Sequence, residues 1–321
     1  VMTVGKNYYG TSSSSITLTG KDGTNGGQGG ELYINITDEK AGFYNQGNIN
    51  TSGGNGTAQA GDAGDIDIAT SGVGGAHIYN SGDITAKGGD GTSGGFGGSI
   101  SLESAKGIKN SGTLDSSAGD MDGPDRIPAG NISFTANLGD IINSGDLVAT
   151  GGELTSAGDE DSISNGGNIT LEANGGDLIS SGNLYSYGGS VASDVEACGG
   201  DGRNITLSSK WAEDDDFNFI ASGDIIISGN INSSGGSSRL SSTCFTSDGG
   251  DITISLDASH VAKGQIIELR GYGEGVFTSG GDAGREGGDA GGIVIQQINS
   301  GDDATSDSVQ DNEDLNSTGG I

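Results

Sequence analysis

Short apolar patches alternate with long polar stretches along the whole chain, and they recur in a fixed order. The clearest unit is residues 137–173, which holds three patches at Ile141–Ile142, Leu147–Val148 and Ile169–Leu171. A tight Asn-Ser-Gly-Asp turn separates the first two patches, and a long Gly- and Asp-rich loop precedes the third. One unit that recurs with loops of changing length is typical of a solenoid.

One anchor of the repeat is an apolar-polar-apolar strand that follows a Gly-rich segment and recurs every 32 to 47 residues. The stretch from Asp65 to Ile68 shows the alternation, and a period of two predicts a β-strand with one buried face. We therefore expect an inward core column of equivalent residues, one from each coil. Its members are Ile66, Ile100, Ile132, Ile169, Ile205, Ile252 and Ile293.

The second anchor is a turn of the form Asn/Ser-x-Gly-x-Ile/Leu. Asn tolerates left-handed backbone and bonds to its own turn, and Gly takes positive φ at no steric cost. Equivalent amides in successive coils are expected to stack as a ladder. That ladder runs through Asn45, Asn80, Asn110 and Asn143 and continues at Ser180.

These anchors predict an all-β protein, a single right-handed parallel β-helix of about eight coils with variable Gly/Asp-rich loops on one side. The hand follows the general preference of parallel crossovers. Residues 1–37 form a first coil without a polar cap, residues 38–299 form the β-helix, and residues 300–321 form an acidic tail. The composition of the tail predicts disorder unless a neighbouring subunit holds it.

Composition agrees with a thin core. The chain has 66 Gly, 2 Pro and 31% hydrophobic residues, too little apolar mass for a wide core. Collagen is excluded because Pro is scarce and no Gly-X-Y period exists. Fixed spacing of apolar pairs argues against disorder, and no stretch approaches the roughly 18 apolar residues of a membrane span.

The net charge is −31, which excludes nucleic acid and anionic membranes as partners because phosphate is repelled. The acids are expected to form a solvated coat, with bound calcium as the sharper alternative. The segment Asp120–Asp125 places carboxylates of Asp120, Asp122 and Asp125 around a Gly turn, which resembles half of an oxygen-ligand loop.

The two cysteines fall at the end of the same loop in adjacent coils. Cys198 precedes Ile205 by seven residues and Cys244 precedes Ile252 by eight. Neighbouring coils lie about 4.8 Å apart, within the reach of a disulfide. We predict a Cys198–Cys244 bridge, and hence an oxidising compartment, with two buried thiols as the alternative.

An insertion after residue 209 carries three aromatic residues, Trp211, Phe217 and Phe219. They predict either an exposed ridge that docks a neighbour or a flap folded over its own coil. Signs of catalysis are few, because His77 and His260 lie in different coils and no Gly-x-Ser-x-Gly elbow occurs. Aromatic platforms for sugars also look scarce. The sequence predicts that the protein is not an enzyme.

Two segments, residues 129–152 (AGNISFTANLGDIINSGDLVATGG) and 166–189 (GGNITLEANGGDLISSGNLYSYGG), resemble repeats of filamentous haemagglutinin-type secreted adhesins. The resemblance covers about residues 15–299 and implies a secreted, cell-surface protein with a structural or adhesive role. We expect a subunit that stacks end to end with its own copies into a fibre. The alternatives are an adhesin shaft that displays loops to a host, matrix or glycan, and, more distantly, a polysaccharide lyase or hydrolase.

Overall fold

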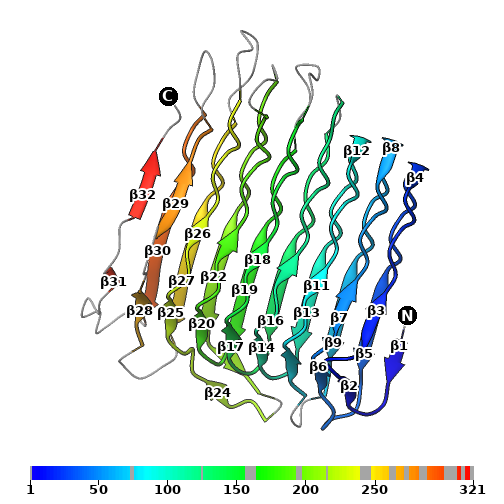
Figure 1. Ribbon diagram of the computed structural model, residues 1–321. Coiled ribbons are helices and arrows are strands. Elements are labelled where there is room, and N and C mark those ends of the chain that lie inside the picture. Colours follow the sequence, from blue (N-terminus) through cyan, green and yellow to red (C-terminus); the bar gives the residue numbers. More distant parts are fainter. Residues whose placement is uncertain are drawn as a thin grey trace.

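The computed structural model is a parallel β-helix (Figure 1). It describes residues 2–72, 76–123, 126–155, 164–192, 197–214, 216–238, 247–259, 265–270, 275–281, 288–299, 309–311 and 315–318. Each coil gives one strand to each of three nine-stranded sheets, here called sheets A, B and C. The predicted fold class is confirmed, with nine rungs where about eight were expected.

Sheet A carries the longest strands. They are β1 (Met2–Val4), β5 (Leu32–Ile36), β9 (Ile66–Thr70), β13 (Ile100–Ser104), β16 (Ile132–Ala136), β19 (Ile169–Asn174), β22 (Ile205–Lys210), β27 (Ile252–Ala258) and β30 (Ile293–Asn299). All pairings in this sheet are parallel, and equivalent residues lie opposite each other. The predicted core column is therefore confirmed from Ile66 to Ile293.

Sheets B and C flank the Asn turn. Sheet B contains β2 (Tyr8–Gly10), β6 (Phe43–Asn45), β10 (Ile78–Asn80), β14 (Ile108–Asn110), β17 (Ile141–Asn143), β20 (Leu178–Ser180), β25 (Ile225–Ile227), β28 (Ile267–Leu269) and β31 (Val309–Asp311). Sheet C contains β3 (Ser15–Thr17), β7 (Asn48–Asn50), β11 (Ile84–Thr85), β15 (Leu114–Asp115), β18 (Leu147–Val148), β21 (Leu184–Tyr185), β26 (Ile231–Asn232), β29 (Val276–Ser279) and β32 (Leu315–Thr318).

Two smaller sheets complete the described strands. The parallel trio β4 (Gly23–Asn25), β8 (Gly56–Gln59) and β12 (Gly91–Ser93) lies near the loop tips of the first coils, at the top of Figure 1. The antiparallel pair β23 (Ala212–Glu213) and β24 (Phe219–Ile220) forms a hairpin. Apolar side chains of the three large sheets fill a narrow core between them.

The described parts of the Gly-rich loops form a regular layer. In each coil an outgoing and a returning segment run side by side, as the paired traces in the upper half of Figure 1 show. Backbone hydrogen bonds join the outgoing and returning segments along the stack. The N–H of Gly54 donates to Gly27 O (2.9 Å), and that of Gly61 donates to Gly54 O (2.9 Å). Further along, Gly89 N–H donates to Gly61 O (3.0 Å), and Gly119 N–H donates to Gly95 O (3.0 Å). A Cβ at Gly89 or Gly119 would meet a carbonyl oxygen of the preceding coil. This close approach accounts for much of the glycine content.

A second, smaller core fills the loop tips of the middle coils. Met121, Leu154 and Val191 pair as successive parallel bridges and are 1%, 2% and 7% exposed. Ala118, Ile127 and Ala197 pack with them. The described residues of these loops are thus part of the packed structure.

Both terminal segments contribute described strands to the three large sheets. Residues 2–17 already supply one strand to each large sheet, so the first coil is more complete than the pattern indicated. In the acidic tail, β31 pairs with β28 and β32 pairs with β29 of the same chain. These described residues extend the protein's own sheets, and contact of the tail with a neighbouring subunit stays a prediction.

Candidate functional site

The predicted asparagine ladder is present at the turn between sheets B and C. The Nδ2 of Asn45 donates to Asn80 Oδ1 (2.8 Å), that of Asn80 to Asn110 Oδ1 (2.8 Å), and that of Asn110 to Asn143 Oδ1 (2.9 Å). Asn143 Nδ2 in turn donates to Ser180 Oγ at 3.3 Å. All five side chains are buried, so the ladder is a structural element of the core.

Each ladder amide also closes its own turn. The Nδ2 groups of Asn45, Asn80, Asn110 and Asn143 donate to the carbonyl oxygen two residues ahead, at 2.6, 2.7, 2.8 and 2.8 Å. Both amide protons are therefore used, one within the coil and one between coils. A glycine follows in every turn because its neighbour in the previous coil approaches too closely for a Cβ, as at Gly112 against Gly82.

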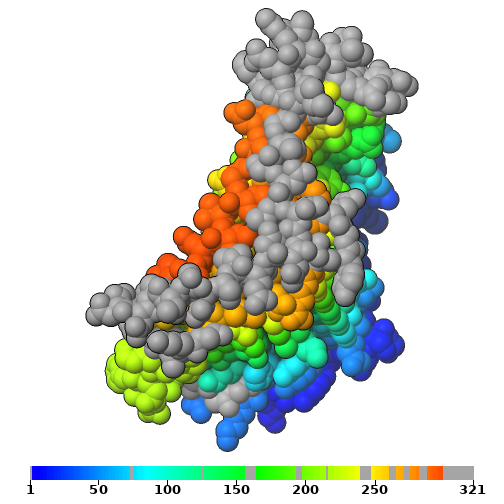
Figure 2. All heavy atoms as spheres, turned by 90° about the vertical axis from the view of Figure 1, so that its left-hand side faces the viewer, coloured from blue at the N-terminus to red at the C-terminus, as the bar shows by residue number. Residues whose placement is uncertain are grey.

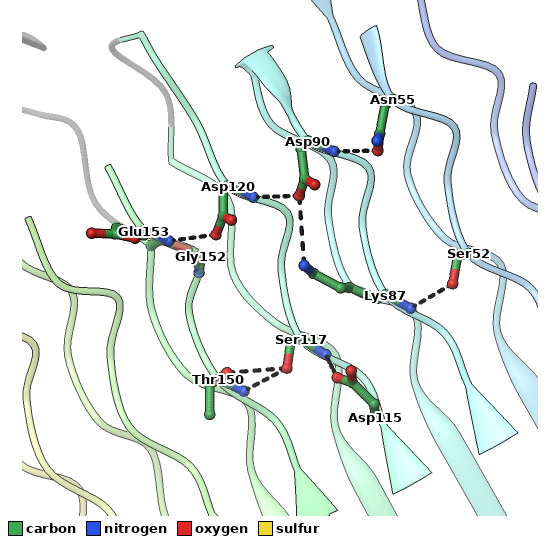
Figure 3. A network of polar contacts seen from close by, with 11 residues as sticks. Ser52, Asn55, Lys87, Asp90, Asp115, Ser117, Asp120, Thr150, Gly152 and Glu153 are labelled. Atoms are coloured by element: carbon green, nitrogen blue, oxygen red, sulfur yellow. Dashed lines mark hydrogen bonds and ion pairs between the residues drawn. The ribbon is translucent and has the colours of Figure 1, made fainter. Parts of the chain in front are cut away.

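Acids on the outside of the coils form further ladders that sequence reasoning missed. In Figure 3, Asp90 N–H donates to Asn55 Oδ1 (2.9 Å), Asp120 N–H to Asp90 Oδ1 (2.9 Å) and Glu153 N–H to Asp120 Oδ1 (2.9 Å). Lys87 makes an ion pair with Asp90 at 3.6 Å. The aspartates in this row accept backbone hydrogen bonds from the next coil. They therefore join the coils, in addition to forming the solvated coat that composition suggested.

The calcium prediction is tested only in part by the geometry. Asp120 and Asp122 flank the buried Met121, and Asp122 bonds to Thr155 Oγ1. Asp125 lies outside the described residues. In the described part of the chain no group of three His, Cys, Asp or Glu side chains is placed to hold a metal ion. A calcium site at Asp120, Asp122 and Asp125 stays a prediction.

The disulfide prediction also involves an undescribed residue. Cys198 is 4% exposed and is not a free thiol. Cys244 lies outside the described residues, so the pairing of the two cysteines stays a prediction.

The aromatic insertion is a projecting hairpin. Trp211 packs edge-on against Phe219 with ring centroids 5.5 Å apart, while Phe217 and Phe219 are 81% and 61% exposed. Phe217 has a φ of 60°, at the tip of the turn where Asn218 donates to Asp214. Those hydrogen bonds lower the pKa of Asp214. Figure 2 shows the yellow-green hairpin region standing out from the body of the coils. This geometry favours an exposed ridge over a flap folded on its own coil.

His77 has a structural environment. Its Nδ1 accepts the N–H of Gly107 at 3.1 Å, and its ring lies 5.6 Å from Tyr79. His260 lies outside the described residues. The structure therefore gives His77 a role in joining two coils, in the same manner as the outer acids.

A stack of tyrosines on the outer face of sheet B is the site that sequence reasoning missed. Tyr9, Tyr44 and Tyr79 occupy equivalent positions in successive coils, with ring centroids 5.1 and 5.2 Å apart and interplanar angles of 15° and 8°. The sequence analysis did not identify this group of neighbouring aromatic rings. The signal was available as Tyr-Gly or Tyr-Asn just before each turn, at a spacing of 35 residues.

The tyrosine stack forms one side of a groove of about 360 Å³. Gln46, Ser81 and Ser111 line it, and Lys109 occupies the next position in the column. Tyr9 is 68% exposed and Tyr79 39%. Partial burial, followed by the neighbouring tyrosines, raises the pKa of Tyr44, and its phenol is neutral at physiological pH as in an ordinary tyrosine. The groove can thus offer neutral ring surfaces, hydroxyls and an amide to a ligand.

Comparison of the chain with protein-family models, curated proteins and solved structures finds no match. No helix within the described ranges is long and apolar enough to cross a membrane.

Proposed function

We propose that the protein is a non-catalytic, extracellular structural protein whose copies stack end to end into a surface fibre. One observation carries the proposal: sheets A, B and C keep one parallel register from rung to rung, so a further rung at the β1–β2–β3 edge would continue all three. Val4, Tyr8 and Ile16 are only partly buried at this edge. Their partners one coil further in are Ile36, Phe43 and Ile49, which are 0–1% exposed.

Unpaired strand edges favour association. In the described structure β1, β2 and β3 each pair on one side, and their outer backbone groups are available to another strand. Met2 and Leu18 add exposed apolar surface at 44% and 37%. A further rung on this edge would bury these side chains and continue all three sheets.

The opposite edge of the described sheets would supply the other half of this contact. β30, β31 and β32 are the last strands of sheets A, B and C, and Ile293 and Ile295 of β30 are partly buried. Contact between two different edges of identical copies is heterologous, and repetition of such a contact gives an open filament. The net charge of −31 opposes close approach, and salt screens this repulsion. Assembly is therefore expected to strengthen with ionic strength.

Electron microscopy and light scattering of the purified protein test the proposal. The wild-type protein should form long unbranched fibres, more of them as salt increases. Thr17→Pro, in the exposed edge strand β3, removes an edge N–H and should leave short rods, whereas the matched Thr17→Ser should still form fibres. Wild-type protein that stays as single rods at every salt concentration, or T17P protein that assembles fully, overturns the proposal.

An adhesin shaft that displays loops is the second candidate. The exposed Phe217 and Phe219 of the projecting hairpin favour it, as does the likeness to filamentous haemagglutinin-type adhesins. Secretion to the cell surface and the Cys198–Cys244 bridge fit both candidates. Isolated short rods that bind cells or matrix through the hairpin would favour the adhesin. Cleavage of an acidic polysaccharide would favour the more distant lyase or hydrolase.

A further inference from the structure

The tyrosine groove has a repeat that a ligand must match. Its three ring centroids lie 5.1 and 5.2 Å apart, with one ring per coil. Aromatic pairs prefer offset stacking. In this arrangement the edge and a strip of the face of each ring stay exposed to the groove. Beside the rings, the turns present Gln46 and Ser81 at the same interval. The groove is thus a straight row of equal units, each with an apolar and a hydrogen-bonding part.

An extended peptide does not fit this row. Side chains on one face of a strand recur about every 6.6 Å, which is twice the rise per residue, and would fall out of step with the rings within two coils. A peptide that adds to a sheet also needs a free strand edge. The strands β6 and β10 beneath Tyr44 and Tyr79 are paired on both sides.

The negative charge of the protein excludes anionic polymers as ligands of the groove. The net charge of −31 repels nucleic acids and acidic polysaccharides, and Lys109 is the one cation that lines the described groove. A chain of neutral sugars carries no charge, has apolar C–H faces for the rings and hydroxyls for Gln46 and Ser81. A ribbon-like β-linked chain advances by about one sugar ring per coil, while an α-linked chain curves away from a straight row.

We propose that the groove along Tyr9, Tyr44 and Tyr79 binds an extended, neutral, β-linked polysaccharide with one sugar ring per coil. The rings pack against the apolar sugar faces, and the turn side chains exchange hydrogen bonds with the sugar hydroxyls. Most specific pockets combine such an apolar lining with a few polar groups. Tyr44 and Tyr79 lie on the side of the solenoid, whereas Tyr9 belongs to β2 at the edge of the proposed fibre contact, so Tyr79 gives the test that is separate from assembly.

Calorimetric titration with cellohexaose and chitohexaose tests the site. At least one of them should bind, while maltohexaose, an α-linked control, and oligogalacturonate, an anionic control, should not. Tyr9→Ser and Tyr79→Ser change exposed rings, and each should weaken binding by about tenfold through loss of one ring contact. Tyr185→Ser, on the outer face of sheet C, is the matched control and should leave affinity unchanged.

Circular dichroism melts of every variant establish that the fold is kept. Absence of binding to both β-linked probes, equal binding of maltohexaose, or preference for oligogalacturonate overturns the proposal. So does a Y79S protein that is folded and binds as well as wild type. Failure of fibre formation has no bearing on these outcomes, and Y9S and Y79S proteins should be compared with wild type by microscopy to keep the two proposals separate.

Discussion

Truncation of one amide in the asparagine ladder should destabilise the whole solenoid. Asn110 is fully buried and takes part in three hydrogen bonds: it accepts from Asn80 (2.8 Å) and donates to Asn143 (2.9 Å) and Gly112 O (2.8 Å). In Asn110→Ala, one N–H of Asn80, the Oδ1 of Asn143 and the carbonyl oxygen of Gly112 lose their partners. An unpaired buried polar group costs about 1–3 kcal/mol, so the free energy of unfolding should fall by about 3–5 kcal/mol.

A matched control separates burial from hydrogen bonding itself. Asn168 belongs to an outer ladder, where it accepts the N–H of Asn204 at 3.1 Å, but it is exposed. Water can replace the bond there, so Asn168→Ala should cost no more than about 0.5 kcal/mol. Asn110→Ser should lie between the two variants, because Ser180 already holds the equivalent position with longer bonds of 3.3 and 3.5 Å.

Urea unfolding measures these differences. Far-UV circular dichroism and the fluorescence of Trp211, the single tryptophan, should give the same midpoint if the solenoid unfolds as one unit. With a slope of about 3 kcal/mol per molar urea, the N110A midpoint should fall by about 1 M or more. If N110A loses no more stability than N168A, the ladder is not a buried determinant of stability and the reasoning is refuted.

Three further outcomes follow from the structure. Gly119→Ala should lower the thermal midpoint strongly, because its Cβ would meet Gly89 O, whereas Gly5→Ala, with open space around it, should not. Burial, and secondly the negative charge of Glu103, raise the pKa of Asp67. Ionisation of Asp67 therefore opposes folding, and stability is lost as the pH rises through the pKa of the folded protein. Asp67→Asn should therefore be more stable than wild type at pH 7, with the gain vanishing below about pH 4. If Asp120, Asp122 and Asp125 hold calcium, a chelator should lower the thermal midpoint of the wild type but not that of Asp125→Asn. Equal wild-type midpoints with and without chelator would refute the calcium site.

The core and the amide ladder could be predicted because their signal lies in side chains. Ile132 and Ile169 recur with alternation of period two, and Asn110 and Asn143 recur before a glycine. In a parallel solenoid such equivalent residues must lie opposite each other, and the pairings of β16 with β19 and of β14 with β17 show that they do. Register and period together define the fold without further information.

The Gly-rich layer could not be predicted in the same way. The bonds from Gly89 to Gly61 O and from Gly119 to Gly95 O join backbone to backbone, and they join an outgoing segment with a returning one. Glycine has no side chain that marks which face is buried. A stretch such as residues 88–98 therefore has the composition of a flexible loop, although in the structure it is packed between its neighbours.

The tyrosine groove was missed for a different reason. Tyr44 and Tyr79 stand one position before ladder residues, on the outward face, where the pattern was treated as solvent-exposed. Counting aromatic residues over the chain hid the fact that three of them share one column. Placement by register, rather than composition, was needed to see that they meet.

The outer acids show how the same residues serve two physical needs. In the file Asp140, Asp177 and Asp224, each Oδ1 accepts the N–H of the next coil, at 2.9, 2.8 and 2.9 Å. A carboxylate is a stronger acceptor than an amide, and its second oxygen remains for water, so Asp strengthens the turn and keeps the surface hydrated. Like charges one coil apart repel each other, however, and this repulsion accumulates along the rod. Asn183 and Asn204 occupy such positions elsewhere without charge. Rows that mix Asp and Asn therefore balance strong hydrogen bonds between coils against repulsion between like charges. The same repulsion opposes the approach of one rod to the end of another.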